Sequence, residues 1–274
     1  MLPSNVPEWP RQPGPGRRFV QAALKPLLAV LLLGGLVGLA EEFVGLDQLA
    51  KLAARQLASS GLPGGDNPES RNWAGYAATT GRYTAVSGTW TVPQFAPDSP
   101  AGTDATWVGI GGVRGTDLIQ AGTQETVLGH GRTEYQAWVE TLPQSSRPVP
   151  LPISAGDAIS ISIEQRANGQ WQIAFVNNTS GQTYQLTVPY RSSLSSAEWV
   201  VEAPSARRGR LLPLDAFGTI TFSQASAVKD GQTVTVAQAG GHAITMVSRG
   251  GQALASPSGL GDDGESFSVL ESLL

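Results

Sequence analysis

The chain contains no cysteine among its 274 residues, so disulfide bonds, thiolate zinc sites and a cysteine nucleophile are excluded. Histidine is also scarce. His130 and His242 are the only two, and a metal site with three histidine ligands is therefore impossible. Charged residues make up 15% of the chain, and its formal net charge is −4. An acidic chain without a basic patch argues against nucleic acid as a partner.

The two histidines lack the surroundings of a catalytic triad. His130 lies in a Gly-His-Gly turn, His242 follows a pair of glycines, and the chain has no Gly-x-Ser-x-Gly elbow for a serine nucleophile. The acidic segment 262–265 lacks the spacing of a calcium-binding loop. The sequence therefore predicts neither a Ser-His-Asp hydrolase nor a metal centre, and we expect no cofactor.

The apolar run Leu27–Ala40 is short for a membrane span, which needs about 20 residues. Arg17 and Arg18 precede it, and Gly38-Leu39-Ala40 offers a small-x-small cleavage site, as in a signal peptide. An uncleaved membrane anchor stays open as the alternative, because Phe19–Leu24 lengthens the run if the intervening lysine snorkels. Either interpretation predicts an extracytoplasmic domain that is secreted or membrane-anchored and faces outward.

The sequence divides into four parts. Residues 1–40 are predicted to hold a disordered N-terminus followed by the signal peptide or anchor. In 41–70 an apolar pattern at helical spacing predicts a pro-segment or spacer helix, and a linker rich in glycine and proline follows it. We expect the folded domain over 71–269 and a short tail over 270–274.

Short runs rich in Val, Ile and Thr recur between breaks, and the chain has 33 glycines and 19 prolines. This pattern favours an all-β sandwich or barrel over alternating β-α-β units. Asn168-Gly169 lies between two such runs, which is a strong signal for a hairpin. The predicted strands are 73–78, 83–92, 106–111, 117–121, 133–141, 158–166, 170–177, 182–188, 198–202, 218–225, 233–237 and 244–249, with 266–269 closing a sheet.

The stretch Trp107–Gly122 predicts a strand, a glycine-rich turn and a second strand. Alternation along the second strand places Gln120 on one face together with Leu118 and Gly122. Taken alone, this pattern is typical of an amide that is hydrogen-bonded on the face of a sheet.

Two further predicted strands carry carboxylates on an alternating face. One presents Gln136, Trp138 and Glu140 on the same side, and the other presents Glu198 and Glu202. The ordinary interpretation is a polar face toward solvent, with tryptophans filling the core. The chain has seven tryptophans, however, and several lie within predicted strands. Aromatic rings beside carboxylates on a sheet face suit a groove for a polymer, either a peptide or a glycan.

Seven short segments follow one another along the chain: Asn72–Tyr76 (NWAGY), Val86–Pro93 (VSGTWTVP), Trp107–Gly112 (WVGIGG), Leu118–Gly122 (LIQAG), Tyr135–Glu140 (YQAWVE), Ala197–Glu202 (AEWVVE) and Phe217–Phe222 (FGTITF). Each segment alone is a weak signal, but the ordered set is specific. Together they resemble the glutamic peptidases, the eqolisins of peptidase family G1, from about Arg71 to Val269.

This resemblance implies an acid endopeptidase built on a β-sandwich of two antiparallel sheets, a concanavalin-like jelly roll, with a Gln–Glu dyad on a concave face. The catalytic glutamine of the family falls on Gln120 and its catalytic glutamate on Glu198. Glu202 shares the face of Glu198 and is the reserve candidate. The supporting glutamate of the family matches Glu140, and the cleft tryptophans of the family match Trp73 and Trp107. The full set of substrate-binding candidates is Trp73, Trp107, Gln136, Trp138 and Glu140.

The sequence departs from the family pattern near the dyad. Gly111 stands where the pattern has aspartate, and Gln124 and Gln136 stand where fungal members carry aspartate. If these replacements remove nearby negative charge, Glu198 ionises more easily. A glutamate with a pKa of about 4.3 fits acidic conditions, so we expect an acidic optimum.

The expected partners are protein or peptide substrates, and we expect a monomer.

The sequence leaves two alternatives to the peptidase function open. One is a carbohydrate-binding or glycan-acting sandwich, in which a retaining glycosidase would need Glu198 and Glu140 about 5–5.5 Å apart. The other is an inactive, peptidase-like binding domain.

Overall fold

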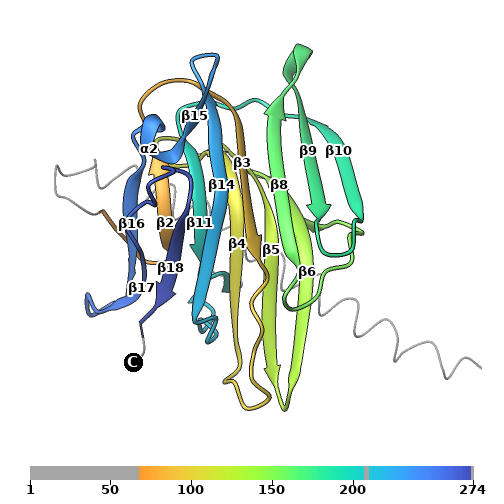
Figure 1. Ribbon diagram of the computed structural model, residues 1–274, viewed down its shortest axis with the longest axis vertical. Helices are drawn as coiled ribbons and strands as arrows, with labels where there is room; N and C mark the ends of the chain where they lie inside the picture. Colours follow the sequence, from red (N-terminus) through yellow and green to blue (C-terminus); the bar gives the residue numbers. More distant parts are fainter. Residues whose placement is uncertain (1–67, 207–209, 273–274) are drawn as a thin grey trace, which may run out of the picture. The chain divides into compact units, whose positions relative to one another are not determined.

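The computed structural model describes residues 68–206 and 210–272, which form two layers of β-strands with almost no helix (Figure 1). The predicted all-β sandwich is therefore confirmed. The predictions for residues 1–40, and nearly all of those for 41–70, lie outside the described residues. Within the described part of the chain, no helix is long and apolar enough to cross a membrane.

We call one layer the site layer, because it carries the residues singled out above. Its strands are antiparallel, and each is hydrogen-bonded to the next in an order that differs from their order along the chain. That order is β7 (Arg147–Pro148), β6 (Arg132–Thr141), β5 (Leu118–Gly129), β4 (Gly102–Gly111), β11 (Ala197–Glu202), β2 (Trp73–Ala78) and β16 (His242–Val247).

The second layer packs against one side of the site layer. Its order is β10 (Thr183–Pro189), β9 (Gln170–Asn177), β8 (Ala158–Gln165), β3 (Tyr83–Thr91), β14 (Thr219–Lys229), β18 (Phe267–Glu271) and β17 (Ala253–Pro257). The layers are continuous through β16, whose first half pairs with β2 and whose second half pairs with β17. The remaining short elements are β1 (Glu69–Ser70) beside β16, β15 (Gln232–Thr235) beside β14, the pair β12 (Ser205–Ala206) and β13 (Arg210–Leu211), the 3₁₀ turn η1 (Ala167–Gly169) and the helix α2 (Val236–Ala239).

The six tryptophans of residues 68–206 and 210–272 divide evenly between the two sides of the site layer. Trp90, Trp171 and Trp199 lie in the core between the layers and are at most 1% exposed. Two of their indoles tie the layers together, because Trp90 Nε1 donates to Thr123 Oγ1 at 3.0 Å and Trp199 Nε1 donates to the Ser87 carbonyl at 2.8 Å. The other three belong to a separate apolar cluster on the opposite side, which consists of Trp73, Ala77, Ala105, Trp107, Val113, Leu118, Trp138, Leu142, Val200 and Ile244.

Two strands, β2 and β9, have the predicted bounds, whereas β5 runs well beyond the predicted end at residue 121. It pairs with β6 from Ile119 opposite Thr141 to Gly129 opposite Arg132. The turn between them contains His130 at a φ of 54°, as expected for a turn histidine. The polar run Thr123–Thr126 concealed the strand from the sequence pattern.

The region 233–257 differs most from the prediction. The strand expected over 233–237 ends at Thr235, which caps the helix α2: its side chain accepts from the Gln238 amide while the Gln238 side chain accepts from the Thr235 amide. His242 begins β16 rather than lying in a turn. The strand β17 was missed because its sequence, Ala-Leu-Ala-Ser-Pro, has little intrinsic preference for strands.

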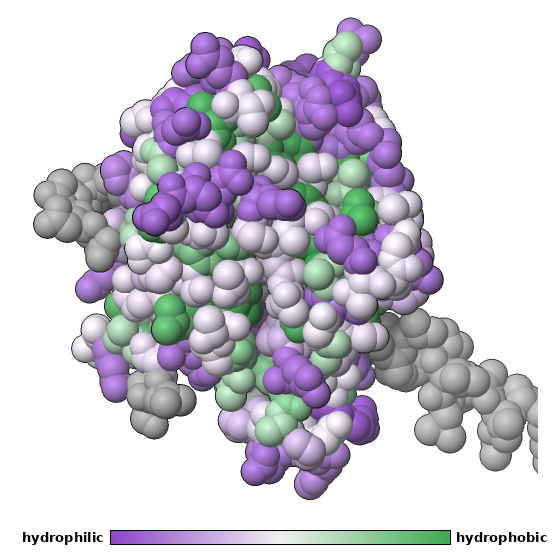
Figure 2. Space-filling model, viewed as in Figure 1, coloured by the Kyte–Doolittle hydropathy of each residue, from purple (hydrophilic) through white to green (hydrophobic). Residues whose placement is uncertain are grey.

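The surface visible in Figure 2 is mostly pale or hydrophilic, with apolar residues scattered singly. Hydroxyl pairs such as Thr89 with Ser160 and Thr221 with Ser268 join neighbouring strands of the second layer. Among the described residues, only Leu128 and Leu270 are large hydrophobic side chains with substantial exposure.

Candidate active site

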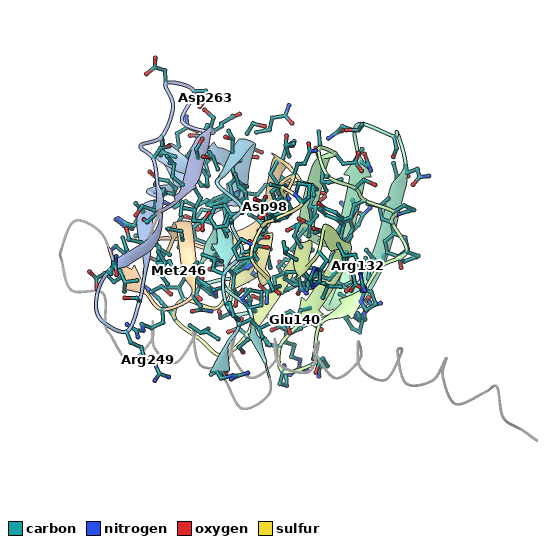
Figure 3. The ribbon with its side chains drawn as sticks, turned by 90° about the horizontal axis from the view of Figure 1, so that it is seen from below. Asp98, Arg132, Glu140, Met246, Arg249 and Asp263 are labelled. Carbon is teal, nitrogen blue, oxygen red and sulfur yellow. The ribbon has the colours of Figure 1, made fainter. Side chains whose placement is uncertain are left out.

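The register of four strands aligns the two predicted catalytic residues. Glu198 on β11 lies opposite Gly109 on β4, Gly109 lies opposite Gln120 on β5, and Gln120 lies opposite Glu140 on β6. Directly paired residues project to the same side of a sheet. These residues, the dyad row, therefore share the side of the site layer that faces away from the second layer, which we call the site face. Figure 3 labels Glu140 on this layer.

Gly109 lies in the middle of the dyad row, and the side chains of Trp107 and Leu118 pack close over its Cα. Two strand spacings separate the backbones of Gln120 and Glu198, which is about 10 Å. A Cβ at position 109 would lie 2.9 Å from Trp107 Cζ3 and 3.0 Å from Leu118 Cδ1. The side chains of Gln120 and Glu198 thus stand on either side of a position that has no side chain of its own.

Glu140 holds the amide of Gln120. Gln120 Nε2 donates a short hydrogen bond to Glu140 Oε2, and both side chains are 2% exposed. Gln120 Oε1 has no hydrogen-bond partner among the described residues. An amide whose one N–H is fixed by a carboxyl group keeps its second N–H for a ligand.

Glu198 is fully buried, and neither carboxyl oxygen has a hydrogen-bond partner within 68–206 and 210–272. Burial raises the pKa of Glu198 well above that of an ordinary glutamate, the nearby Ser196 hydroxyl partly opposes this effect, and the charge of Asp117 adds to it. The expectation that the replaced aspartates let Glu198 ionise more easily stays a prediction, and burial acts on this carboxyl group in the opposite direction.

Glu202, the reserve candidate, has a different environment. Asn72 Nδ2 donates to one of its oxygens at 2.9 Å, and Trp107 Nε1 donates to the other at 2.8 Å. Burial raises its pKa to about 7, and these donors, together with Trp73, limit the increase. Glu202 lies four residues along β11 from Glu198, in a row with Ala105 rather than with Gln120. The register thus pairs Gln120 with Glu198.

The predicted substrate-binding residues also lie on the site face. Trp73, Trp107 and Trp138 belong to its apolar cluster, and the rings of Trp73 and Trp107 meet edge to face with centroids 5.0 Å apart. Gln136 lies in the row of Glu202 and is half-buried. The site face therefore combines aromatic rings, two amides and three carboxyl groups, as the strand alternation predicted.

Several residues of this region were not predicted as part of the site. They are Asn72, which binds Glu202, and Asp117 and Tyr190, which bind near the ends of β5, β6 and β11. Asn72 begins the first of the seven segments that resemble the family, so the sequence did contain a signal for this residue. Tyr190 lies in a loop, where alternation predicts no direction for a side chain, and the predicted strand 117–121 put Asp117 on the face opposite Gln120.

The geometry does not fit the glycosidase alternative. Glu198 and Glu140 lie on strands that are three spacings apart, which is about 14 Å, with Gly109 and Gln120 between them. A retaining glycosidase needs its carboxyl groups about 5–5.5 Å apart. The described residues also contain no cluster of three histidine, aspartate or glutamate side chains that could hold a metal ion.

Comparison with known proteins agrees with this arrangement. The model of the Peptidase A4 family matches residues 71–267. The chain belongs to this family, the eqolisins or glutamic peptidases. The A4 peptidase described here is 30% identical to aspergillopepsin-2 of Aspergillus niger over 199 residues, which cover 63% of this chain and 70% of that protein. The resemblance inferred from the seven segments is confirmed, and the chain is a hydrolase that acts on peptide bonds.

Solved structures show the same fold. Scytalido-glutamic peptidase, solved with a transition-state analogue inhibitor, superposes with a TM-score of 0.62 at 22% identity, covering 74% of this chain and 98% of that one. Aspergilloglutamic peptidase from Aspergillus niger has a TM-score of 0.55 at 27% identity, covering 62% of the A4 peptidase and 99% of that chain.

Proposed function

We propose that the A4 peptidase is an acid-acting endopeptidase that cleaves peptide bonds through a dyad of Gln120 and Glu198. The observation that supports this proposal is the dyad row, in which the two side chains flank Gly109 on one face of the site layer. In this proposal the scissile carbonyl group and the attacking water lie between the side chains of Gln120 and Glu198.

In this mechanism Glu198 acts first as a base and then as an acid. Its carboxylate takes a proton from water while the water oxygen forms a bond to the carbonyl carbon. The protonated Glu198 then gives that proton to the amide nitrogen as the C–N bond breaks, which restores the carboxylate. Because the reaction begins with the carboxylate, activity rises with pH on the acid side as Glu198 ionises, and burial places this rise at a higher pH than an ordinary glutamate would give.

Gln120 stabilises the negative oxygen of the tetrahedral intermediate. One N–H of its amide is fixed by Glu140, so the other points in a defined direction without rearranging during the reaction. A single donor of this kind contributes about 2.7–4 kcal/mol to transition-state stabilisation. An amide donor does not titrate, so Gln120 works at any pH at which the fold persists.

The substrate is proposed to be an extended peptide that lies on the site face. Scytalido-glutamic peptidase has been solved with a peptide-based transition-state analogue, and SCP-B, an eqolisin, with the tripeptide Ala-Ile-His.

The test is cleavage of denatured casein by the full chain from pH 2 to 7. We expect cleavage within this range that falls at least about 100-fold in Gln120→Ala and in Glu198→Gln, each checked for folding by circular dichroism. Glu202→Gln is the matched control and should retain activity. Activity that survives Glu198→Gln but disappears in Glu202→Gln would transfer the role of base to Glu202, and a folded protein without activity at any pH would contradict the proposal.

A further inference from the structure

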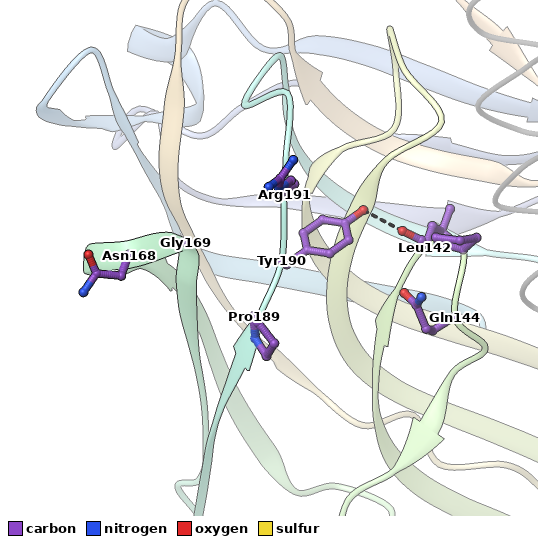
Figure 4. A pocket seen from close by; sticks show the side chains of 8 residues that line it. Leu142, Gln144, Asn168, Gly169, Pro189, Tyr190 and Arg191 are labelled. Carbon is purple, nitrogen blue, oxygen red and sulfur yellow. Dashed lines mark hydrogen bonds between the residues drawn. The ribbon is translucent and has the colours of Figure 1, made fainter.

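The connection between β10 and β11 runs across the ends of the strands that carry the dyad row. Its first residue, Tyr190, bridges the start of β5 and the end of β6: its hydroxyl accepts from the Leu118 amide at 2.7 Å and donates to the Leu142 carbonyl at 2.9 Å (Figure 4). Farther along, Ser196 Oγ donates to the Gly111 carbonyl at 3.0 Å and thereby joins the end of β4. This segment then enters β11, which carries Glu198.

Asp117 fastens the middle of this connection. Its Oδ2 atom accepts from the backbone N–H of Ser193 at 2.6 Å and from the hydroxyl of Ser192 at 3.1 Å. Asp117 immediately precedes β5, three residues before Gln120, and the two serines shortly precede Glu198. One carboxyl group thus links the strand of Gln120 to the strand of Glu198, although β4 lies between these strands.

Gly111 makes this link sterically feasible. A Cβ at position 111 would lie 2.6 Å from the Asp117 carbonyl oxygen and 2.8 Å from Asp117 Oδ2, and Gly111 has a φ of 94°, which disfavours any other residue. The family pattern predicts an aspartate at position 111, where this chain has glycine. The carboxyl group of Asp117 occupies the space beside that position.

We propose that Asp117 is a positioning residue for the peptidase reaction, which clamps the ends of the strands carrying Gln120 and Glu198 and holds its carboxyl group at the loop that leads into Glu198. This inference rests on the proposed function for its effect on catalysis. The clamp itself rests on the hydrogen bonds and on the contact with Gly111.

Other ionisable groups surround Glu198, and each lies on a different element. Glu202 is on the same strand, Glu140 is at the far end of the dyad row on β6, Tyr83 is at the start of β3, and the exposed His242 lies beyond Ala77 in the same row on β16. Asp117 is the charged residue that raises the pKa of Glu198 in addition to burial. Replacing it with a neutral residue should therefore let Glu198 ionise at lower pH.

Two variants separate the charge from the clamp. Asp117→Asn keeps an oxygen that can accept from Ser193 N–H, so we expect the acid limb of kcat/KM to move down by about 0.5–1 pH unit while kcat changes less than about 3-fold. Asp117→Ala removes both functions, and we expect the same shift together with a fall in kcat of about 10-fold or more at unchanged KM. The matched control is Asp157→Asn, because Asp157 also accepts from a backbone amide and a side chain but lies between β7 and β8, and its pH profile should stay that of the wild type.

An acid limb that does not move in Asp117→Asn, or that moves equally in Asp157→Asn, would overturn the proposal. The second measurement does not depend on turnover. The full chain is labelled with ¹³C-glutamate, and NMR follows the signal of the Glu198 carboxyl carbon with pH to give its pKa. The Glu198→Gln variant, which lacks this signal, assigns it. A lower pKa in Asp117→Asn supports the placement of charge even if casein is not cleaved, in which case only the proposed function fails. An unchanged pKa rejects the proposal whether or not the protein is active.

Discussion

The two faces of the site layer surround most of their buried carboxyl groups differently. On the site face, Glu202 accepts from Asn72 and Trp107 and Glu140 accepts from Gln120, whereas Glu198 has no partner for either oxygen among the described residues. On the core face, toward the second layer, Asp104 on β4 lies opposite Glu125 on β5, and Asp215 approaches them beside Gly102. These three side chains are fully buried, and none of their six carboxyl oxygens has a hydrogen-bond partner among the described residues.

This difference separates the site-face carboxyl groups that donors hold, Glu202 and Glu140, from a cluster in which burial favours the neutral forms. Burial raises the pKa of Glu125 to about 8 and that of Asp215 to about 10, and it raises the pKa of Asp104 well above its usual range. The charge of a neighbouring acid adds to the shift in each case. Because the same strands make both faces, ionisation of the acids on the core face would destabilise the strands that carry the dyad row.

The largest expected effect is a loss of stability between acidic and neutral pH. Between pH 4.5 and about 8 the unfolded chain has lost the proton of Glu125 while the folded protein keeps it. The free energy of unfolding therefore falls by about 1.4 kcal/mol per pH unit from this group, or about 3 kcal/mol between pH 4.5 and 7, and Asp215 acts in the same direction. Urea unfolding at a series of pH values measures this slope.

Glu125→Gln should flatten that slope, because the amide does not titrate, and Glu164→Gln is the control. Glu164 is an exposed acid on β8 that pairs with Arg166 at 2.6 Å, so its replacement should leave the slope unchanged. Equal slopes in wild type and Glu125→Gln would show that the core face does not limit the protein to acid.

A smaller effect is expected from adding a side chain at the middle of the dyad row. The Cβ of Gly109→Ala would crowd Trp107 and Leu118 on the site face, and we expect a destabilisation of about 1–3 kcal/mol and at least about a 10-fold fall in kcat. Gly88→Ala is the comparison on the core side, where a Cβ would lie 3.2 Å from Val108 Cγ1. It should affect urea stability but not kcat. Equal falls in kcat would mean that Gly109 has no role of its own.

The sequence predicted the site more completely than the core-face cluster, for a physical reason. Alternation within single strands put Gln120, Glu140 and Glu198 on definite faces, and the ordered motifs connected those strands to one family. The approach of Asp215 to Asp104 depends on long-range packing, which no local pattern encodes. The hydrogen bond from Ser193 to Asp117 also joins residues far apart in the sequence, and Asp117 lies just before β5 rather than within it as the predicted strand 117–121 implied.

The smallest expected effect concerns the donor that distinguishes the site face from the core face. In Asn72→Ala, one oxygen of Glu202 loses its donor, so the pKa of Glu202 should rise above its present value of about 7. We expect a destabilisation of about 1 kcal/mol at pH 4, where Glu202 is protonated, and a larger one at pH 7, where the lost donor stabilised the ionised form. Urea unfolding at both pH values tests this, and kcat at pH 4 should stay within about 3-fold of the wild type, because Glu202 is not in the dyad row. A fall in kcat as large as that of Glu198→Gln would instead mean that Glu202 takes part in the reaction. Glu202, whose oxygens accept from donors, would then not differ in role from Glu198.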